Sequence, residues 1–242
     1  MRSLSAALFA LAFLSSTAFA EDLVKTGFIK KTHKNKDGTE SPYVVFVPHD
    51  YDGKKEFPII LFLHGAGETK GGTKEPVEVG IGPAIKTREK TSPFIVVFPQ
   101  SEKRTWSASS DDGKRAIAIL DTTMKELKVD AKRQYLTGLS MGGYGTWSAA
   151  AEYPNRWAAI APICGGGDPK DAEKIKSIPC WAFHGNEDEP VSVMRSREMI
   201  DALKAAGGEP RYTEYKWVGH DSWDPAYATN QLYEWMLKQS KK

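Results

Sequence analysis

The stretch Thr137-Gly138-Leu139-Ser140-Met141-Gly142-Gly143 lies where an apolar run passes into an amphipathic segment. This order predicts a strand, a tight turn and a helix, which is the setting of a nucleophile elbow. Ser140 falls in the turn, and Gly138 and Gly142 flank it because larger side chains there would collide where strand and helix approach closely. The pattern therefore predicts an exposed serine hydroxyl at the tip of the turn.

Short apolar runs alternate with longer mixed segments along most of the chain. Three of these runs lack alternating polar positions, as expected for strands that are covered on both faces. Two earlier strand-like runs, at 27–31 and 43–48, enclose the hairpin-turn signal Asp37-Gly38. The pattern predicts an α/β fold with a mostly parallel central sheet, helices on both faces and an N-terminal antiparallel hairpin. The predicted strands are 58–64, 94–98, 135–139, 158–163, 180–184 and 211–217, and the predicted helices are 115–127, 143–152, 191–206 and 227–237.

Residues 1–20 have the pattern of a secretory signal peptide. A positive charge at Arg2 precedes an apolar run at about 4–14, and Ala18-Phe19-Ala20 supplies a small-x-small cleavage signal before Glu21. The run is shorter than the roughly 20 residues that a membrane-spanning helix needs. The sequence thus predicts a signal peptide at 1–20 and a single catalytic domain at 21–242 that is secreted or periplasmic.

The overall charge is nearly balanced, with 33 basic and 31 acidic residues. This balance gives no electrostatic reason to expect a nucleic-acid partner or an anionic membrane surface. No two histidines have a metal-ligand spacing such as HxxxH, so no metal site is predicted. Chemistry at a serine nucleophile needs no organic cofactor. Cys164 and Cys180 are expected at opposite ends of neighbouring strands, too far apart for a disulfide, and therefore as free, mostly buried thiols.

A serine nucleophile requires a base to take its proton and a third group to orient that base. His220 follows the last predicted strand and precedes the last helix, which makes it the candidate base. His64 and His184 each end an apolar strand and precede glycine, a position that favours a structural or loop-setting role. His33 and His49 lie in the hairpin region, away from the expected site, and are predicted at the surface.

The acid is expected between serine and histidine in chain order, on the loop after the preceding strand. Asp188 has this position, four residues after His184, and is the predicted acid. Asp168, which follows a run of three glycines, is the alternative. The predicted catalytic order is thus Ser140, Asp188 and His220.

Two backbone N–H groups are candidates for an oxyanion hole. The first belongs to Met141, the residue after the nucleophile, and the second to Ala66 in the glycine-rich turn at 63–68. In isolation those glycines are better explained as a tight strand exit, whereas together with the predicted triad they favour the oxyanion role. Trp106 and Trp223 lie on or near loops at the same edge, where they are candidates either for an aromatic wall that binds substrate or for packing.

Several motifs together resemble those of secreted carboxylesterases of the α/β-hydrolase superfamily. More narrowly, they resemble the predicted-peptidase or prolyl-oligopeptidase-like group, which is related to feruloyl esterases and polyhydroxybutyrate depolymerases. The resemblance implies an α/β-hydrolase fold and the same three residues, Ser140, Asp188 and His220. One departure is Glu68-Thr69-Lys70-Gly71, because many relatives have arginine and glycine after the glutamate. The motifs are LHGAGE at 63–68, GLSMGGYGTW at 138–147, APICGGGDP at 161–169, WAFHGNEDEPV at 181–191 and GHDSWDPAY at 219–227.

These observations predict a secreted serine carboxylic-ester hydrolase that acts through an acyl-enzyme on Ser140. The expected substrate is a small-molecule or polysaccharide-linked ester. A small serine peptidase is one alternative, although residues 21–242 leave no room for the large additional domain of prolyl oligopeptidases. A catalytically idle hydrolase-fold binding module is another. A dienelactone-hydrolase-like activity would require cysteine where Ser140 stands.

Overall fold

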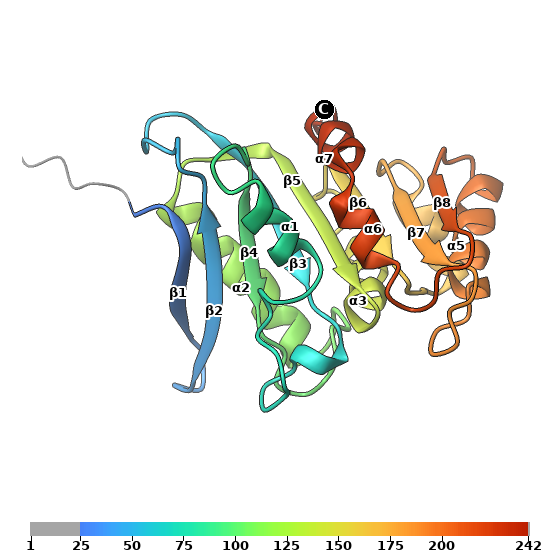
Figure 1. Ribbon diagram of the computed structural model, residues 1–242, viewed down its shortest axis with the longest axis horizontal. Coiled ribbons are helices and arrows are strands. Elements are labelled where there is room, and N and C mark those ends of the chain that lie inside the picture. Colours follow the sequence, from blue (N-terminus) through green and yellow to red (C-terminus); the bar gives the residue numbers. More distant parts are fainter. Residues whose placement is uncertain (1–24, 242) are drawn as a thin grey trace, which may run out of the picture.

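A single eight-stranded sheet, in the order β1-β2-β4-β3-β5-β6-β7-β8, forms the centre of the molecule (Figure 1). The computed structural model describes residues 25–241, so the predicted signal peptide lies outside the described residues. The β1–β2 and β2–β4 pairs are antiparallel, and every other neighbouring pair is parallel. The predicted mostly parallel α/β sheet with an N-terminal antiparallel hairpin is confirmed. The strands are β1 (Gly27–Lys34), β2 (Glu40–Val47), β3 (Phe57–Leu63), β4 (Ile95–Pro99), β5 (Val129–Leu139), β6 (Ala159–Ile163), β7 (Trp181–Gly185) and β8 (Arg211–Tyr215).

Helices cover both faces of this sheet (Figure 1). Side chains of α2, α3, α4 and α5 join one buried cluster, and those of α1, α6 and α7 join the other. All of β3 is buried, with Leu61 in the first cluster and Phe62 in the second, because successive side chains of a strand point to opposite faces. Each such side chain contributes about 1.5–3 kcal/mol by its removal from water. The helices are α1 (Ile81–Thr87), α2 (Asp111–Glu126), α3 (Met141–Glu152), α4 (Ala172–Ile175), α5 (Met194–Ala205), α6 (Trp223–Ala228) and α7 (Asn230–Leu237), with 3₁₀ turns η1 (Ala66–Glu68) and η2 (Pro169–Asp171).

The parallel strands bring several distant loops to one edge of the sheet. Leu63 at the end of β3 pairs with Gly138 near the end of β5, and Leu139 pairs with Ile163 at the end of β6. Farther along, Gly185 at the end of β7 pairs with Tyr215 of β8. The segments that follow these five strands therefore begin side by side, although they are far apart in the sequence.

Two of the differences between the observed and the predicted helices have a clear cause in a helix cap. The helix predicted at 227–237 is two helices, because Thr229 has an extended backbone and its side chain caps α7 by accepting from Gln231 N. Likewise α2 begins at Asp111 rather than near 115, because the Ser110 hydroxyl accepts from Gly113 N and caps the first turn.

The two cysteines are free and buried, as predicted. Cys164 follows the carboxyl end of β6, whereas Cys180 directly precedes β7. Among residues 25–241, no helix has the length and apolar character needed to cross a membrane.

Candidate active site

The turn between β5 and α3 holds Ser140 in a backbone conformation that is unusual for a residue with a side chain, with φ 53° and ψ −117°. A Cβ added at Gly142 would lie 1.8 Å from Leu63 O, and one at Gly138 would lie 2.4 Å from Gly142 O. Both positions therefore require glycine, for the steric reason that the motif indicated. Positive-φ residues of this kind cost about 1–3 kcal/mol each and cluster at functional sites.

A line of hydrogen bonds joins Ser140 to His220 and His220 to Asp188. His220 Nε2 lies 2.9 Å from Ser140 Oγ, and His220 Nδ1 lies 2.7 Å from Asp188 Oδ2. The Asp188 side chain has no exposed surface, whereas the His220 side chain is 23% exposed. Three residues that belong to the loops after β5, β7 and β8 thus meet at one point.

The donors and acceptors in this line allow only one direction of proton transfer. The Asp188 carboxylate can only accept, so His220 Nδ1 carries a proton and donates to it. His220 Nε2 is then free to accept the Ser140 hydroxyl proton. The arrangement can therefore take the proton from Ser140 as its oxygen attacks an electrophile, and can stabilise the imidazolium that results.

Asp188 is held in place by two further groups. The Val191 N–H donates to Asp188 Oδ1 at 2.8 Å. His184 Nε2 lies 3.1 Å from Asp188 Oδ2, the same oxygen that His220 contacts. The expected structural role of His184 did not include this contact. The i, i+4 spacing of His184 and Asp188 across a strand end is the only sequence signal for it.

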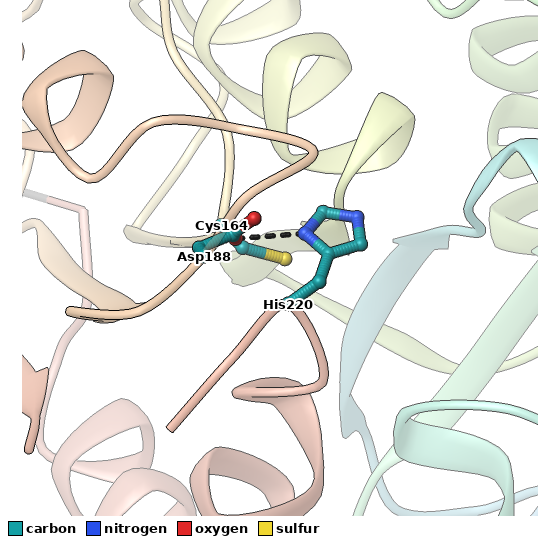
Figure 2. A group of neighbouring side chains, drawn as sticks. All are labelled: Cys164, Asp188 and His220. Atoms are coloured by element: carbon teal, nitrogen blue, oxygen red, sulfur yellow. Dashed lines mark hydrogen bonds and ion pairs between the residues drawn. The ribbon is translucent and has the colours of Figure 1, made fainter. Parts of the chain in front are cut away.

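Cys164 contacts the backbone of the nucleophile Ser140. The sequence analysis did not predict this contact. Its Sγ accepts from Ser140 N at 3.3 Å, and its own backbone has a φ of 39°. Figure 2 shows the thiol beside Asp188 and His220, and the ligand atoms of the three residues lie within 4.8 Å of one another.

These three side chains are the one group in the described part of the chain that is close enough together to hold a metal ion. Burial, however, raises the pKa of the Cys164 thiol far above its usual range and keeps it protonated. Asp188 and His220 already bond each other. The arrangement therefore favours the hydrogen-bonded line over metal coordination.

The two candidate oxyanion donors begin short helical segments. Met141 is the first residue of α3 and Ala66 is the first residue of η1, so neither backbone N–H has a partner within its own helix. A Cβ added to Gly65 would lie 3.8 Å from Ser140 Cβ, which places the loop after β3 against the serine. Ala66 and Met141 also line the same pocket.

His64 connects the loop after β3 to the loop after β4. Ser101 N donates to His64 Nε2 at 3.0 Å, so the ring proton is on Nδ1, which lies 2.6 Å from Gly65 O. Burial lowers the pKa of His64 to about 4, and the ring is neutral near pH 7. Trp106 packs edge-on against this ring and its indole N–H donates to His64 O at 2.9 Å. His64 is a structural residue, in agreement with the expectation from its position at a strand end.

A pocket of about 620 Å³ opens next to Ala66 and Met141. Three aromatic side chains and two methionines form much of its wall, and Arg104, Asp168 and Asp171 add charged groups. Asp168, the alternative acid, caps η2 through Lys170 N and lies in this wall rather than beside His220. The aromatic and methionine residues are Trp106, Tyr144, Trp147, Met141 and Met199.

Trp223 lies outside this pocket lining. Its ring contacts the His220 ring edge-on, with centroids 5.3 Å apart, and it is half-buried at the start of α6. The two predicted tryptophans thus have different surroundings: Trp106 lines the pocket next to Met141, and Trp223 contacts the His220 ring.

Residues 36–231 match the model of the protein family described as "Putative esterase". The chain belongs to this esterase family. It is similar to the bifunctional acetylxylan esterase/xylanase XynS20E of Neocallimastix patriciarum, with 29% identity over 161 residues, 65% of this chain and 23% of the relative. It is also similar to feruloyl esterase D of Neurospora crassa, with 24% identity over 180 residues, 72% of this chain and 62% of the relative.

A solved structure described as a thermostable esterase supports the same family assignment. It superimposes with a TM-score of 0.80 at 38% identity, over 88% of this chain and 63% of the solved chain. The α/β-hydrolase fold and the resemblance to feruloyl esterases are confirmed. This esterase-family chain spans less than two thirds of the length of each of these three proteins.

Proposed function

We propose that the protein is a serine carboxylic-ester hydrolase that forms an acyl-enzyme on Ser140. The observation that carries the proposal is the unbroken line from Ser140 Oγ through His220 to the buried Asp188 carboxylate. Its nucleophile has the strained backbone of an elbow. The family of esterases to which the chain belongs supports the same reaction class.

The proposed reaction has two halves. Ser140 Oγ bonds to the ester carbonyl carbon while its proton passes to His220 Nε2, and the imidazolium then gives this proton to the alcohol oxygen as the C–O bond breaks. Water bonds to the acyl carbon in the second half, His220 takes its proton, and the proton returns to Ser140 as the acid leaves. The N–H groups of Met141 and Ala66 stabilise the oxyanion in both halves, at roughly 3 kcal/mol for each donor.

The acyl group is proposed to enter the pocket beside Met141. His220 must protonate the leaving alcohol, so the alcohol lies on the His220 and Trp223 side, whereas the pocket lining includes neither residue. A volume of about 620 Å³ far exceeds the need of an acetyl group and falls in the range of ligand sites. Because aromatic rings prefer edge-to-face or offset contacts with other rings, the walls favour an aromatic acyl group. One of the similar proteins is described as a feruloyl esterase, and a feruloyl group is an aromatic acyl group of this kind.

Export of the protein is part of the proposal. The charged start, the short apolar run and the small-x-small signal at 18–20 support removal of residues 1–20 and leave 21–242 as one catalytic domain. The substrate would then be an ester encountered outside the cytoplasm, either a small molecule or a polysaccharide-linked one.

Covalent trapping tests the proposed function. Hydrolysis of p-nitrophenyl esters should begin with a burst of p-nitrophenol, and mass spectrometry after an acid quench should find one acyl group on the peptide that contains Ser140. Pretreatment with a fluorophosphonate should label the same peptide and abolish turnover. Absence of hydrolysis across acetyl, butyryl, octanoyl and feruloyl esters, or an acyl group on another residue, would overturn the proposal.

Replacement of Tyr144 tests the assignment of the acyl pocket. Tyr144 lines the pocket and is 40% exposed, so Tyr144→Ala should remove a ring contact without unfolding the protein. An aromatic pair contributes about 0.5–1.5 kcal/mol, and we therefore expect kcat/KM for methyl ferulate to fall by up to about tenfold. The value for an acetyl ester should change by less than about twofold. Tyr153→Ala, at the other end of α3 and outside this pocket, is the matched control. Equal losses on both esters would contradict the assignment.

A further inference from the structure

We propose that His184 is a positioning residue for the reaction, in which it donates a hydrogen bond to the Asp188 oxygen that also accepts from His220. The inference rests on the proposed function, because its consequence is expressed through His220 acting as a base. Asp188 Oδ2 would then serve two histidines, His220 at 2.7 Å and His184 at 3.1 Å. His184 does not contact the reacting serine and acts only through the carboxylate.

The surroundings of His184 determine where its proton lies. Nε2 faces two groups that can only accept, the Asp188 carboxylate at 3.1 Å and the Val191 carbonyl at 2.9 Å. Nε2 must therefore carry the proton. Nδ1 lies 2.7 Å from Ser196 Oγ, and this hydroxyl also lies 3.0 Å from Gly165 O, so its proton can go to either group. A neutral ring with its proton on Nε2 shares that proton between Asp188 and Val191. It accepts at Nδ1 when the Ser196 hydroxyl points to the ring rather than to Gly165 O.

Burial keeps this ring neutral. The His184 side chain has no exposed surface, and desolvation lowers its pKa from the usual value, with the nearby His220 acting in the same direction. A neutral ring shares its Nε2–H between Val191 O and Asp188 Oδ2 and adds no positive charge beside the carboxylate. The Oδ2 atom of Asp188 therefore faces donors from both histidines.

This shared acceptor has a defined effect on His220. An oxygen that already accepts from His184 attracts the His220 Nδ1–H less strongly than a free one, so His184 weakens the hydrogen bond between Asp188 and His220. Removing the His184 donor should strengthen the Asp188–His220 pair and make His220 a stronger base. The His220 titration, and with it the acidic limb of kcat/KM, should then move to higher pH.

Two of the ionisable groups near these rings keep one charge state through the neutral range. Cys164, on the loop after β6, stays a neutral thiol because burial raises its pKa. Glu214 on β8 is hydrogen-bonded to Arg197 of α5, which lowers the pKa of this carboxyl, so it stays ionised through the neutral range. Asp188, His184 and His220 themselves are the coupled set, and the measured midpoints belong to that set.

Two substitutions of His184 separate hydrogen-bond donation from packing. The amide of His184→Gln reaches the position of Nε2 and can donate to Asp188, whereas the shorter His184→Asn reaches only the position of Nδ1, next to Ser196. Both variants introduce an amide into the same buried site. A purely structural role would therefore give similar losses in melting temperature and in activity for the two.

The test is to measure kcat/KM against pH for wild type and both variants, together with the ¹H–¹³C titration of the His220 Cε1 signal. The chain has five histidines, and His220→Gln identifies the signal. We expect His184→Asn to raise the acidic limb and the His220 midpoint by about half a pH unit to one unit, and to lower kcat up to about tenfold. His184→Gln should keep both midpoints within about 0.2 unit of wild type.

The inference is overturned if the two variants shift the His220 midpoint equally, or if neither shifts it. A shift in His184→Asn alone supports it, whether it is seen by kinetics or by NMR. A wild-type protein that hydrolyses no ester but still shows the NMR difference would overturn the proposed function and leave the His184 contact supported. The two failures are therefore distinguishable.

Discussion

Ser140→Ala is expected to lower kcat for ester hydrolysis by about a million-fold, the loss typical of a serine nucleophile that acts as one unit with its base. The hydroxyl is 2.9 Å from His220 Nε2, and alanine has no atom to attack the carbonyl carbon. The remaining activity, about 10³–10⁴ above the uncatalysed rate, would come from substrate binding and the Met141 and Ala66 N–H groups.

The measurement is the initial rate on a p-nitrophenyl ester at saturating substrate, with the melting temperature as a check on folding. Alanine and serine have similar backbone preferences, so the strained turn should persist and the melting temperature should stay within a few degrees of wild type. Ser177→Ala, at an exposed position away from the site, is the matched control and should retain full activity. If Ser140→Ala kept more than about one per cent of wild-type kcat, a different nucleophile would have to be sought.

The parts of the fold that could be predicted are those in which a local sequence pattern is compatible with only one structure. Continuous apolar runs such as β3 require burial on both faces, and the alternation of such runs with helical segments requires a mostly parallel sheet. The split at Thr229 was not predictable from periodicity, because the apolar positions of α6 and α7 continue across it. The cause of the split is a single cap by the Thr229 side chain. This cap competes with one continuous helix only in the folded protein.

For the candidate site, the order of the residues along the chain and their positions after strand ends predicted the three candidate catalytic residues. Contacts between neighbouring loops could not be predicted in this way. Ser140, Asp188 and His220 each follow a strand, and parallel strands bring such positions to one edge. The contacts of Cys164 with Ser140 N and of His184 with Asp188 depend on how β6 and β7 are aligned with their neighbours. A shift of one residue would turn these side chains to the other face, and no sequence pattern specifies that alignment here.

Asp188→Asn is expected to lower kcat by about ten-thousand-fold, the loss observed when a buried triad carboxylate becomes an amide. Val191 N donates to Oδ1, so the amide oxygen should take that position and the NH₂ group should replace Oδ2. This NH₂ would face the His220 Nδ1–H and the His184 Nε2–H, which are both donors. His220 can relieve the conflict only by moving its proton to Nε2, where it can no longer accept from Ser140.

The prediction is checked by kcat on the same ester near neutral pH, with Asp201→Asn, an exposed change on α5, as the matched control. KM should change little, because Asp188 has no exposed surface and lies outside the acyl pocket lining. A loss smaller than about tenfold would mean that Asp188 is not the group that orients His220. Asp168, which lies in the pocket wall, would then have to be examined by Asp168→Asn, and a large loss there would replace Asp188 in the mechanism. If Asp168→Asn is also mild, the imidazole is oriented without a carboxylate, and the hydrogen-bonded line from Ser140 to Asp188 is structural rather than catalytic.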